Sequence, residues 1–198
     1  MRKMPKIRIS IPFCILVATL YALDFGNVFL PAFVAIMIHE VSHIAAIRLT
    51  GASFDRIDIR AFGVSVNVPE LIYMPYSKEI IIAAAGPLAG FLTAATALLA
   101  ANVFGFMVPR YFIGINVLIS LINLIPVYPL DGGRIALSLS LKLFSMRAAY
   151  VISSVLSILS TGVLFGICAA CAAKGNLNPS LVIFSLYVAA CQIKLRHL

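Results

Sequence analysis

The stretch that decides the fold is residues 28–49, which read VFLPAFVAIMIHEVSHIAAIRL. These 22 residues are mostly apolar, and a helix of that length rises about 33 Å, enough to cross the roughly 30 Å hydrocarbon core of a bilayer. Three ionisable side chains, His39, Glu40 and His43, lie in the middle of the segment, and Arg48 lies near its end. Ionisable groups are costly to insert into a membrane, so these three residues need a functional reason.

The whole chain has the composition of an integral membrane protein. Of its 198 residues, 62% are hydrophobic and 11% are charged, against about 25% charged in an average soluble domain. The surface of a soluble domain of this size needs far more charge. The formal net charge of +8 would suggest a nucleic-acid partner for a soluble protein. Here we expect no nucleic acid, because the bases of a membrane protein lie in loops, where they set topology and contact anionic headgroups.

Six apolar segments predict an all-α membrane protein, a bundle of six transmembrane helices forming a single domain over residues 1–198. Bases precede the first segment, as in a signal peptide, but no small-x-small cleavage site follows it, which favours a retained first span. The predicted spans are residues 9–23, 28–49, 80–101, 111–126, 148–173 and 179–194.

Between the second and third spans, residues 54–68 alternate between apolar and polar side chains, with Phe62-Gly63 in the middle. A period of two interrupted by a glycine predicts a short β-hairpin. The apolar positions of the alternation are Ile57, Ile59, Ala61, Val64, Val66 and Val68.

The basic residues predict the orientation of the chain. If the N-terminus is cytoplasmic and all six spans cross, thirteen of the fifteen Lys and Arg residues lie inside, and only Arg110 and Lys174 lie outside. This distribution follows the positive-inside rule. We therefore expect both termini and the hairpin on the cytoplasmic side of the membrane.

Two pairs of glycines recur at four-residue spacing, Gly86 with Gly90 and Gly162 with Gly166. Small residues at this spacing let two membrane helices approach closely. We expect helix–helix contacts at both pairs, and we expect no other role for the second.

The polar cluster in residues 39–43 has the H-E-x-x-H pattern of zinc hydrolases. His39 and His43 lie on one face of a helix, because positions four apart stand one above the other, so both can bind one metal ion. Glu40 can act as general base toward water that the metal activates. The alternative is a pair of polar histidines packed in the bundle, but three ionisable groups in one span favour the metal. His39 lies about 16 Å along the helix from Val28, within the bilayer.

A catalytic zinc ion usually takes three protein ligands, and Asp131 is the candidate for the third. It ends the motif of residues 123–133, NLIPVYPLDGG, in which prolines break the helix and glycines allow a tight turn. Broken backbone at membrane depth is tolerated where it lines a cavity. Two alternatives stay open: Asp131 caps the following helix, or His197 supplies the third ligand.

These motifs resemble those of the site-2 protease family of intramembrane zinc metalloproteases. The resemblance also includes Ala85-Gly86-Pro87-Leu88-Ala89-Gly90, similar to the glycine-proline motif of the family, and Phe62-Gly63. Ser42 stands where many members have glycine. The layout of six spans with cytoplasmic termini is similar to the bacterial sporulation-type group, related to stage IV sporulation factor FB, which processes a membrane-tethered sigma-factor precursor.

The resemblance implies a metalloendopeptidase that cuts membrane-tethered substrate proteins within or next to their transmembrane segments. It implies one zinc ion per chain, held by His39, His43 and Asp131, with Glu40 as catalytic base. Asn123 would support the substrate backbone or its oxyanion, the alternative being a helix–helix hydrogen bond. It further implies a multi-pass protein of the bacterial cytoplasmic membrane, in contact with lipid, its substrate and a possible membrane regulator.

Two other functions remain open. One is a catalytically silent metal-binding scaffold in the membrane, which would have no need for the base Glu40. The other is a metal transporter, for which we expect repeated halves with acidic residues in several spans.

The predicted hairpin suggests how a substrate could bind. A peptide must be extended to reach the metal, and the strand Val64–Val68 could pair with it by β-augmentation. The alternative is an amphipathic loop at the membrane surface.

Overall fold

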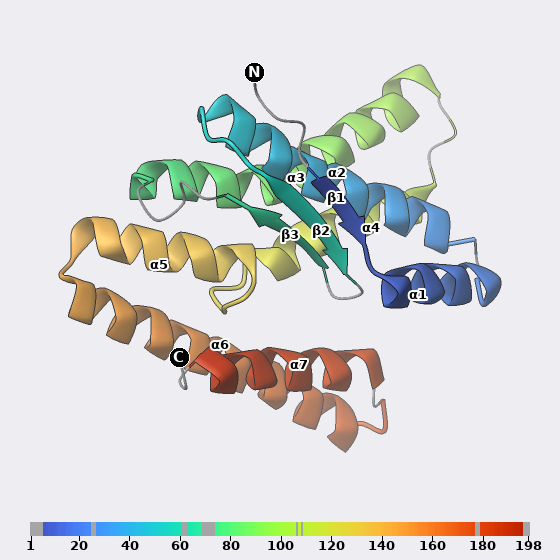
Figure 1. Ribbon diagram of the computed structural model, residues 1–198. Coiled ribbons are helices and arrows are strands. Elements are labelled where there is room, and N and C mark those ends of the chain that lie inside the picture. Colours follow the sequence, from blue (N-terminus) through green and yellow to red (C-terminus); the bar gives the residue numbers. More distant parts are fainter. Residues whose placement is uncertain are drawn as a thin grey trace. The chain divides into compact units, whose positions relative to one another are not determined.

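The computed structural model describes residues 6–24, 27–60, 63–68, 74–105, 107, 109–176 and 179–195. The chain divides into two compact units, residues 1–121 and 122–198. In chain order the described elements are β1, α1, α2, β2, β3, α3 and α4, followed by α5, α6 and α7 (Figure 1). We describe each unit by itself.

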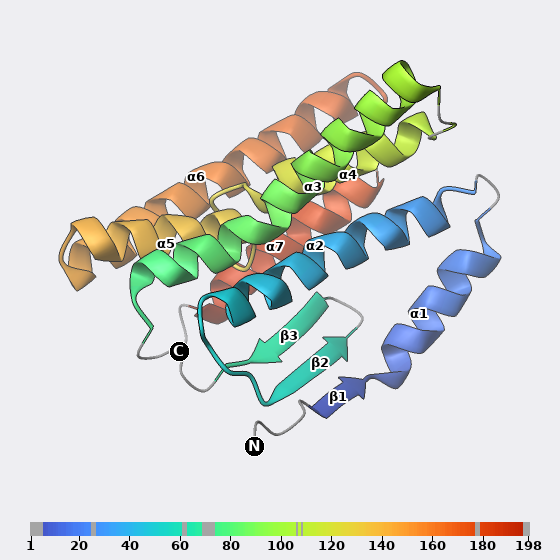
Figure 2. The same ribbon diagram turned by 90° about the horizontal axis from the view of Figure 1, so that it is seen from above.

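The first unit is built on two long helices, α2 (Phe29–Leu49) and α3 (Tyr76–Phe104). The C-terminal half of α2 packs against the N-terminal half of α3 (Figure 2). Gly90 of α3 lies against α4 (Arg110–Asn123). A Cβ atom at Gly90 would lie 2.2 Å from the Ser120 hydroxyl. The expectation of close helix packing is therefore confirmed at Gly90.

A three-stranded sheet lies in the same unit, in the order β1 (Lys6–Ile9), β2 (Arg56–Arg60) and β3 (Gly63–Asn67). Strands β2 and β3 pair antiparallel, and β1 pairs parallel with β2. The sequence predicted two strands in this region, and the third comes from the N-terminal segment. Figure 2 shows the three strands side by side.

The first predicted span is wrong at its start, because Ile9 belongs to β1. The Ser10 amide donates to the Ile59 carbonyl at 2.9 Å, which extends the strand pairing. Ser10 then caps α1 (Ile11–Ala22), since its hydroxyl accepts a hydrogen bond from the Phe13 amide at 3.4 Å. A serine cap followed by proline in the first turn is a common helix start.

The sheet is anchored to the C-terminal end of α2 and the first turns of α3. The Arg48 guanidinium lies 5.0 Å from the centre of the Phe54 ring, and the Lys78 ammonium donates to the Thr50 carbonyl at 2.8 Å. The buried apolar residues of this core are Ala46, Ile47, Ala52, Phe54, Ile57, Val68 and Ile82.

The second unit consists of α5 (Asp131–Leu143), α6 (Met146–Ala173) and α7 (Pro179–Leu195), each packed against the next. The prediction of close helix contact at Gly162 and Gly166 is wrong. Within the described second unit, a Cβ atom built at either glycine meets no atom within 4 Å.

Three of the described helices, α2, α3 and α6, are long and apolar enough to cross a membrane. The other three predicted spans also correspond to helices, but α1, α4 and α7 are shorter. The 12 residues of α1 rise about 18 Å, less than the hydrocarbon thickness. By helix length and composition, the described residues support three of the six predicted crossings.

Candidate metal centre

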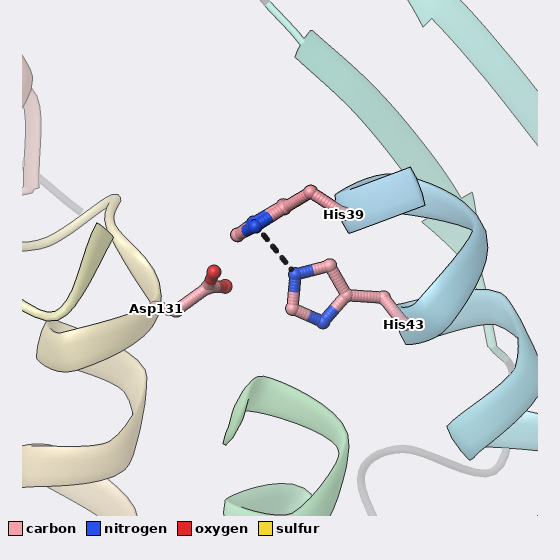
Figure 3. Close-up of side chains that lie close together, drawn as sticks. All are labelled: His39, His43 and Asp131. Atoms are coloured by element: carbon pink, nitrogen blue, oxygen red, sulfur yellow. Dashed lines mark hydrogen bonds between the residues drawn. The ribbon is translucent and has the colours of Figure 1, made fainter. Parts of the chain in front are cut away.

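Two histidines face each other in the first unit. His39 is the middle residue of the 21-residue helix α2, and His43 lies one turn further on. Both side chains are buried, and their Nε2 atoms are 3.1 Å apart (Figure 3). The four-residue spacing thus brings two imidazole nitrogens together in a helix that can span the membrane, with His39 about 15 Å from either end.

The ring of His43 is oriented by a hydrogen bond that it donates to the neighbouring helix. Its Nδ1 atom lies 2.7 Å from the Ile82 carbonyl of α3. Because a carbonyl only accepts, Nδ1 donates this hydrogen bond, and in the neutral imidazole Nε2 then keeps its lone pair. This is how metal-binding histidines are commonly held, with one ring nitrogen donating to a carbonyl and the other directed to the metal.

Gly86 leaves space beside both ring nitrogens. A Cβ atom at this position would lie 2.3 Å from Nε2 of His43 and 2.7 Å from Nε2 of His39. The expected helix–helix contact is therefore present at Gly86, and its partners on α2 are the two histidines. The glycine-proline motif that contains Gly86 was the feature of the sequence that could have indicated a role for this residue near the histidines.

The remaining residues of the H-E-x-x-H pattern follow the same helix. Glu40 is half-buried, directly after His39. The Ser42 hydroxyl donates to the Ile38 carbonyl at 2.7 Å. Serine in place of glycine therefore leaves no unsatisfied polar group in the span.

Asp131 belongs to the second unit, where it is buried and begins α5 (Figure 3). The N-cap position is Leu130, so Asp131 does not occupy the capping position that one alternative assigned to it. Its Oδ1 atom lies 3.5 Å from Nη1 of Arg134, one helical turn later. This ion pair and the N-terminus of α5 both favour the ionised carboxylate that a metal ligand requires. Arg134 is not among the site residues predicted from the sequence, although its three-residue spacing from Asp131 on a helix indicates such a pair.

Two glycines allow the loop before Asp131 to fold back on the first turn of α5. A Cβ atom at Gly132 would lie 2.1 Å from the Leu124 carbonyl oxygen, and one at Gly133 would lie 2.5 Å from the Tyr128 amide nitrogen. Any larger residue would have to displace backbone. Asn123, half-buried, is the last residue of α4 and stands at the other end of this loop.

The residues present fit a metal ion. His39 and His43 of the first unit can offer two imidazole nitrogens, and Asp131 of the second unit can offer a carboxylate oxygen. These are ligand types that zinc takes. Two nitrogens bound tetrahedrally to one zinc ion at about 2.0–2.1 Å are roughly 3.3 Å apart, close to the 3.1 Å between the two Nε2 atoms. The alternative ligand His197 and the predicted Phe62 element lie outside the described residues.

Comparison with known proteins finds relatives by sequence. The chain is 27% identical over 169 residues to a zinc metalloprotease of Methanocaldococcus jannaschii, covering 81% of this chain and 46% of the relative. It is 28% identical over 122 residues to stage IV sporulation protein FB of Bacillus subtilis, covering 58% and 41%. The chain thus spans less than half the length of each of these relatives. No family model matches it.

Comparison with solved structures finds the same fold in a site-2 protease from Methanocaldococcus jannaschii. The TM-score is 0.65 with 22% sequence identity, covering 98% of this chain and 92% of the other. Together with the sequence relatives, this fold confirms the resemblance of the chain to the site-2 protease family, its sporulation-type members included.

Proposed function

We propose that this protein is a zinc-dependent intramembrane endopeptidase that hydrolyses peptide bonds within or next to transmembrane segments of membrane-tethered proteins. The observation that carries the proposal is the buried His39–His43 pair at the middle of a membrane-spanning helix, with Gly86 leaving space at both Nε2 atoms. Two imidazoles buried at this depth in a membrane cost free energy unless they have a binding partner. A metal ion bound to both would be that partner.

In this proposal His39, His43 and Asp131 hold one zinc ion per chain. Zinc, when bound, acts as a Lewis acid and lowers the pKa of water toward neutrality. Glu40 accepts a proton from the attacking water and passes it to the nitrogen of the scissile amide as the C–N bond breaks. Asn123 donates a hydrogen bond to the substrate backbone or to the developing oxyanion.

Asp131→Ala is expected to weaken zinc binding by at least about 100-fold, because loss of an outer-shell partner alone costs about 10–100-fold and this change removes a ligand. The measurement is zinc content and chelator competition on the purified chain in detergent. Asp55→Ala removes an exposed carboxylate of the first unit and should leave zinc bound. Full zinc occupancy in Asp131→Ala would exclude this residue as a ligand.

The proposal includes a binding mode for the substrate. In the described sheet, β3 pairs with β2 and forms one edge of the strand order. A substrate peptide that unwinds inside or near a membrane needs hydrogen-bond partners for its backbone N–H and C=O groups. The backbone of an edge strand can be that partner. We therefore propose that an extended segment of the substrate pairs with β3.

Val66→Pro is expected to reduce cleavage about tenfold or more while zinc stays bound, because proline removes one backbone donor and restricts the strand. Val66 also packs against the apolar core, so Val66→Ala serves as the control that shortens the side chain and keeps the N–H. Equal cleavage by the proline and alanine variants would count against strand addition.

We also propose an orientation of the chain in the membrane and a candidate substrate. The basic residues favour cytoplasmic termini, and the sheet is anchored at the end of α2 that carries Arg48. A membrane-tethered sigma-factor precursor is a substrate that the sporulation-type resemblance suggests.

Reconstitution tests the function. Purified protein in liposomes with a single-span substrate should cleave that substrate only when zinc is present. Zinc bound without cleavage of any substrate would instead support the metal-binding scaffold, and zinc flux across the liposome membrane would support the transporter.

A further inference from the structure

The loop of residues 124–130 is held from the side of α6. It is irregular because Pro126 and Pro129 have no N–H to continue the helix, and carbonyl groups in broken backbone at membrane depth need donors. The Ser157 hydroxyl of α6 donates to the Pro126 carbonyl at 3.3 Å. Ser157 is buried, so this hydrogen bond lies inside the second unit.

Ser157 is in turn contacted from the last helix. The Gln192 side-chain amide of α7 donates to the Ser157 carbonyl at 3.1 Å and to the Thr161 hydroxyl. Ser157 and Thr161 are each about 8% exposed. Polar side chains in apolar helices are tolerated when they meet one another. Here they converge on the segment that leads to Asp131.

Val127 packs the loop on one side, where its side chain is fully buried, and the other side of the loop borders a cavity. A cavity of about 310 Å³ lies within the second unit, and Tyr128, Gly133, Ser157 and Gln192 are among its lining residues. A loop beside a cavity lacks the close packing that would restrict it. The Ser157 hydrogen bond holds the loop on the side that faces this cavity.

We propose that Ser157 and Gln192 are positioning residues for the metal ligand Asp131. Gln192 fixes the turn of α6 that contains Ser157, and Ser157 fixes the Pro126 carbonyl by its hydrogen bond. The position of the loop in turn sets the position of the Asp131 carboxylate, five residues after Pro126. Helix α7 thereby contributes to metal binding although it supplies no ligand. This inference rests on the proposed function, because it requires that Asp131 bind the metal.

The test compares zinc affinity of the full chain in detergent, by chelator competition, for Ser157→Ala and Gln192→Met. Each should bind zinc about tenfold more weakly, the usual effect of removing a group that orients a ligand. Ser157→Thr keeps a hydroxyl and has the cavity to hold its methyl group, so it should restore wild-type affinity.

Ser185→Ala is the matched control. Ser185 is a fully buried serine of α7 whose hydroxyl lies 3.4 Å from the Cys168 sulfur of α6. Its removal disturbs the same helix pair without touching the loop, and zinc affinity should not change. Amide hydrogen exchange of residues 124–130 in metal-free protein should rise in Ser157→Ala and stay unchanged in Ser185→Ala.

Zinc affinity of Ser157→Ala and Gln192→Met within twofold of wild type would overturn the inference. An equal loss in Ser185→Ala would overturn it as well, because the effect would then be general helix destabilisation. If wild type itself binds no zinc, the proposed function fails instead, so the two failures are distinguishable.

Discussion

Glu40→Gln is expected to lower the rate of substrate cleavage by about 10²–10⁴-fold, the usual contribution of a general base, while zinc remains bound. Glutamine has the size of glutamate, but its amide cannot accept a proton from water. Its neighbours His39 and His43, which are four residues apart on α2, still offer both ring nitrogens to the metal. The measurement is single-turnover cleavage in liposomes together with zinc content of the same preparation.

Glu79→Gln makes the same chemical change in the first turn of α3 and should cleave at nearly the wild-type rate. Wild-type cleavage by Glu40→Gln would show that Glu40 is not the base. Loss of zinc from Glu40→Gln would show that this side chain supports metal binding instead. If Glu40→Gln keeps its zinc but no longer cleaves the substrate that the wild type cleaves, the protein is a protease and not a silent scaffold.

Gly86→Ala is expected to lower zinc affinity by about 100-fold. This is the largest loss usually seen when a group that supports a metal ligand is mutated. The added methyl group would lie 2.3 Å and 2.7 Å from the two Nε2 atoms, so either the rings move or the space beside them is filled. Alanine is favoured over glycine inside a helix by about 1 kcal/mol, so local helix stability should not fall. Zinc competition and thermal unfolding of the metal-free chain separate these two effects.

Gly162→Ala is the control for Gly86→Ala. It is the same substitution inside an apolar helix, at a position where the new methyl group meets no atom within 4 Å. Its zinc affinity should match wild type, and its thermal stability should be equal or higher. Wild-type zinc affinity in Gly86→Ala would mean that the metal does not use the space beside this glycine.

Much of the helical architecture follows from local sequence. Every predicted apolar segment corresponds to a described helix. In lipid, a helix satisfies all the backbone hydrogen bonds of the segment internally, while its apolar side chains contact lipid. The errors lie at the ends and in the number of long spans. The first segment includes Ile9, which pairs with β2 through the strand contacts of Lys6–Ile9. No periodicity within that short segment reveals a partner about fifty residues away.

The sequence by itself determined the two imidazoles proposed as ligands and their spacing on α2, because His39 and His43 meet through the geometry of a single helix. It also indicated Asp131 from the prolines and glycines around it. Only the tertiary structure decided that the Ile82 carbonyl orients His43 and that Gly86 leaves space at both rings. These contacts join segments 39 or more residues apart in the chain. They depend on how α2 and α3 pack, which helical spacing within one segment does not specify.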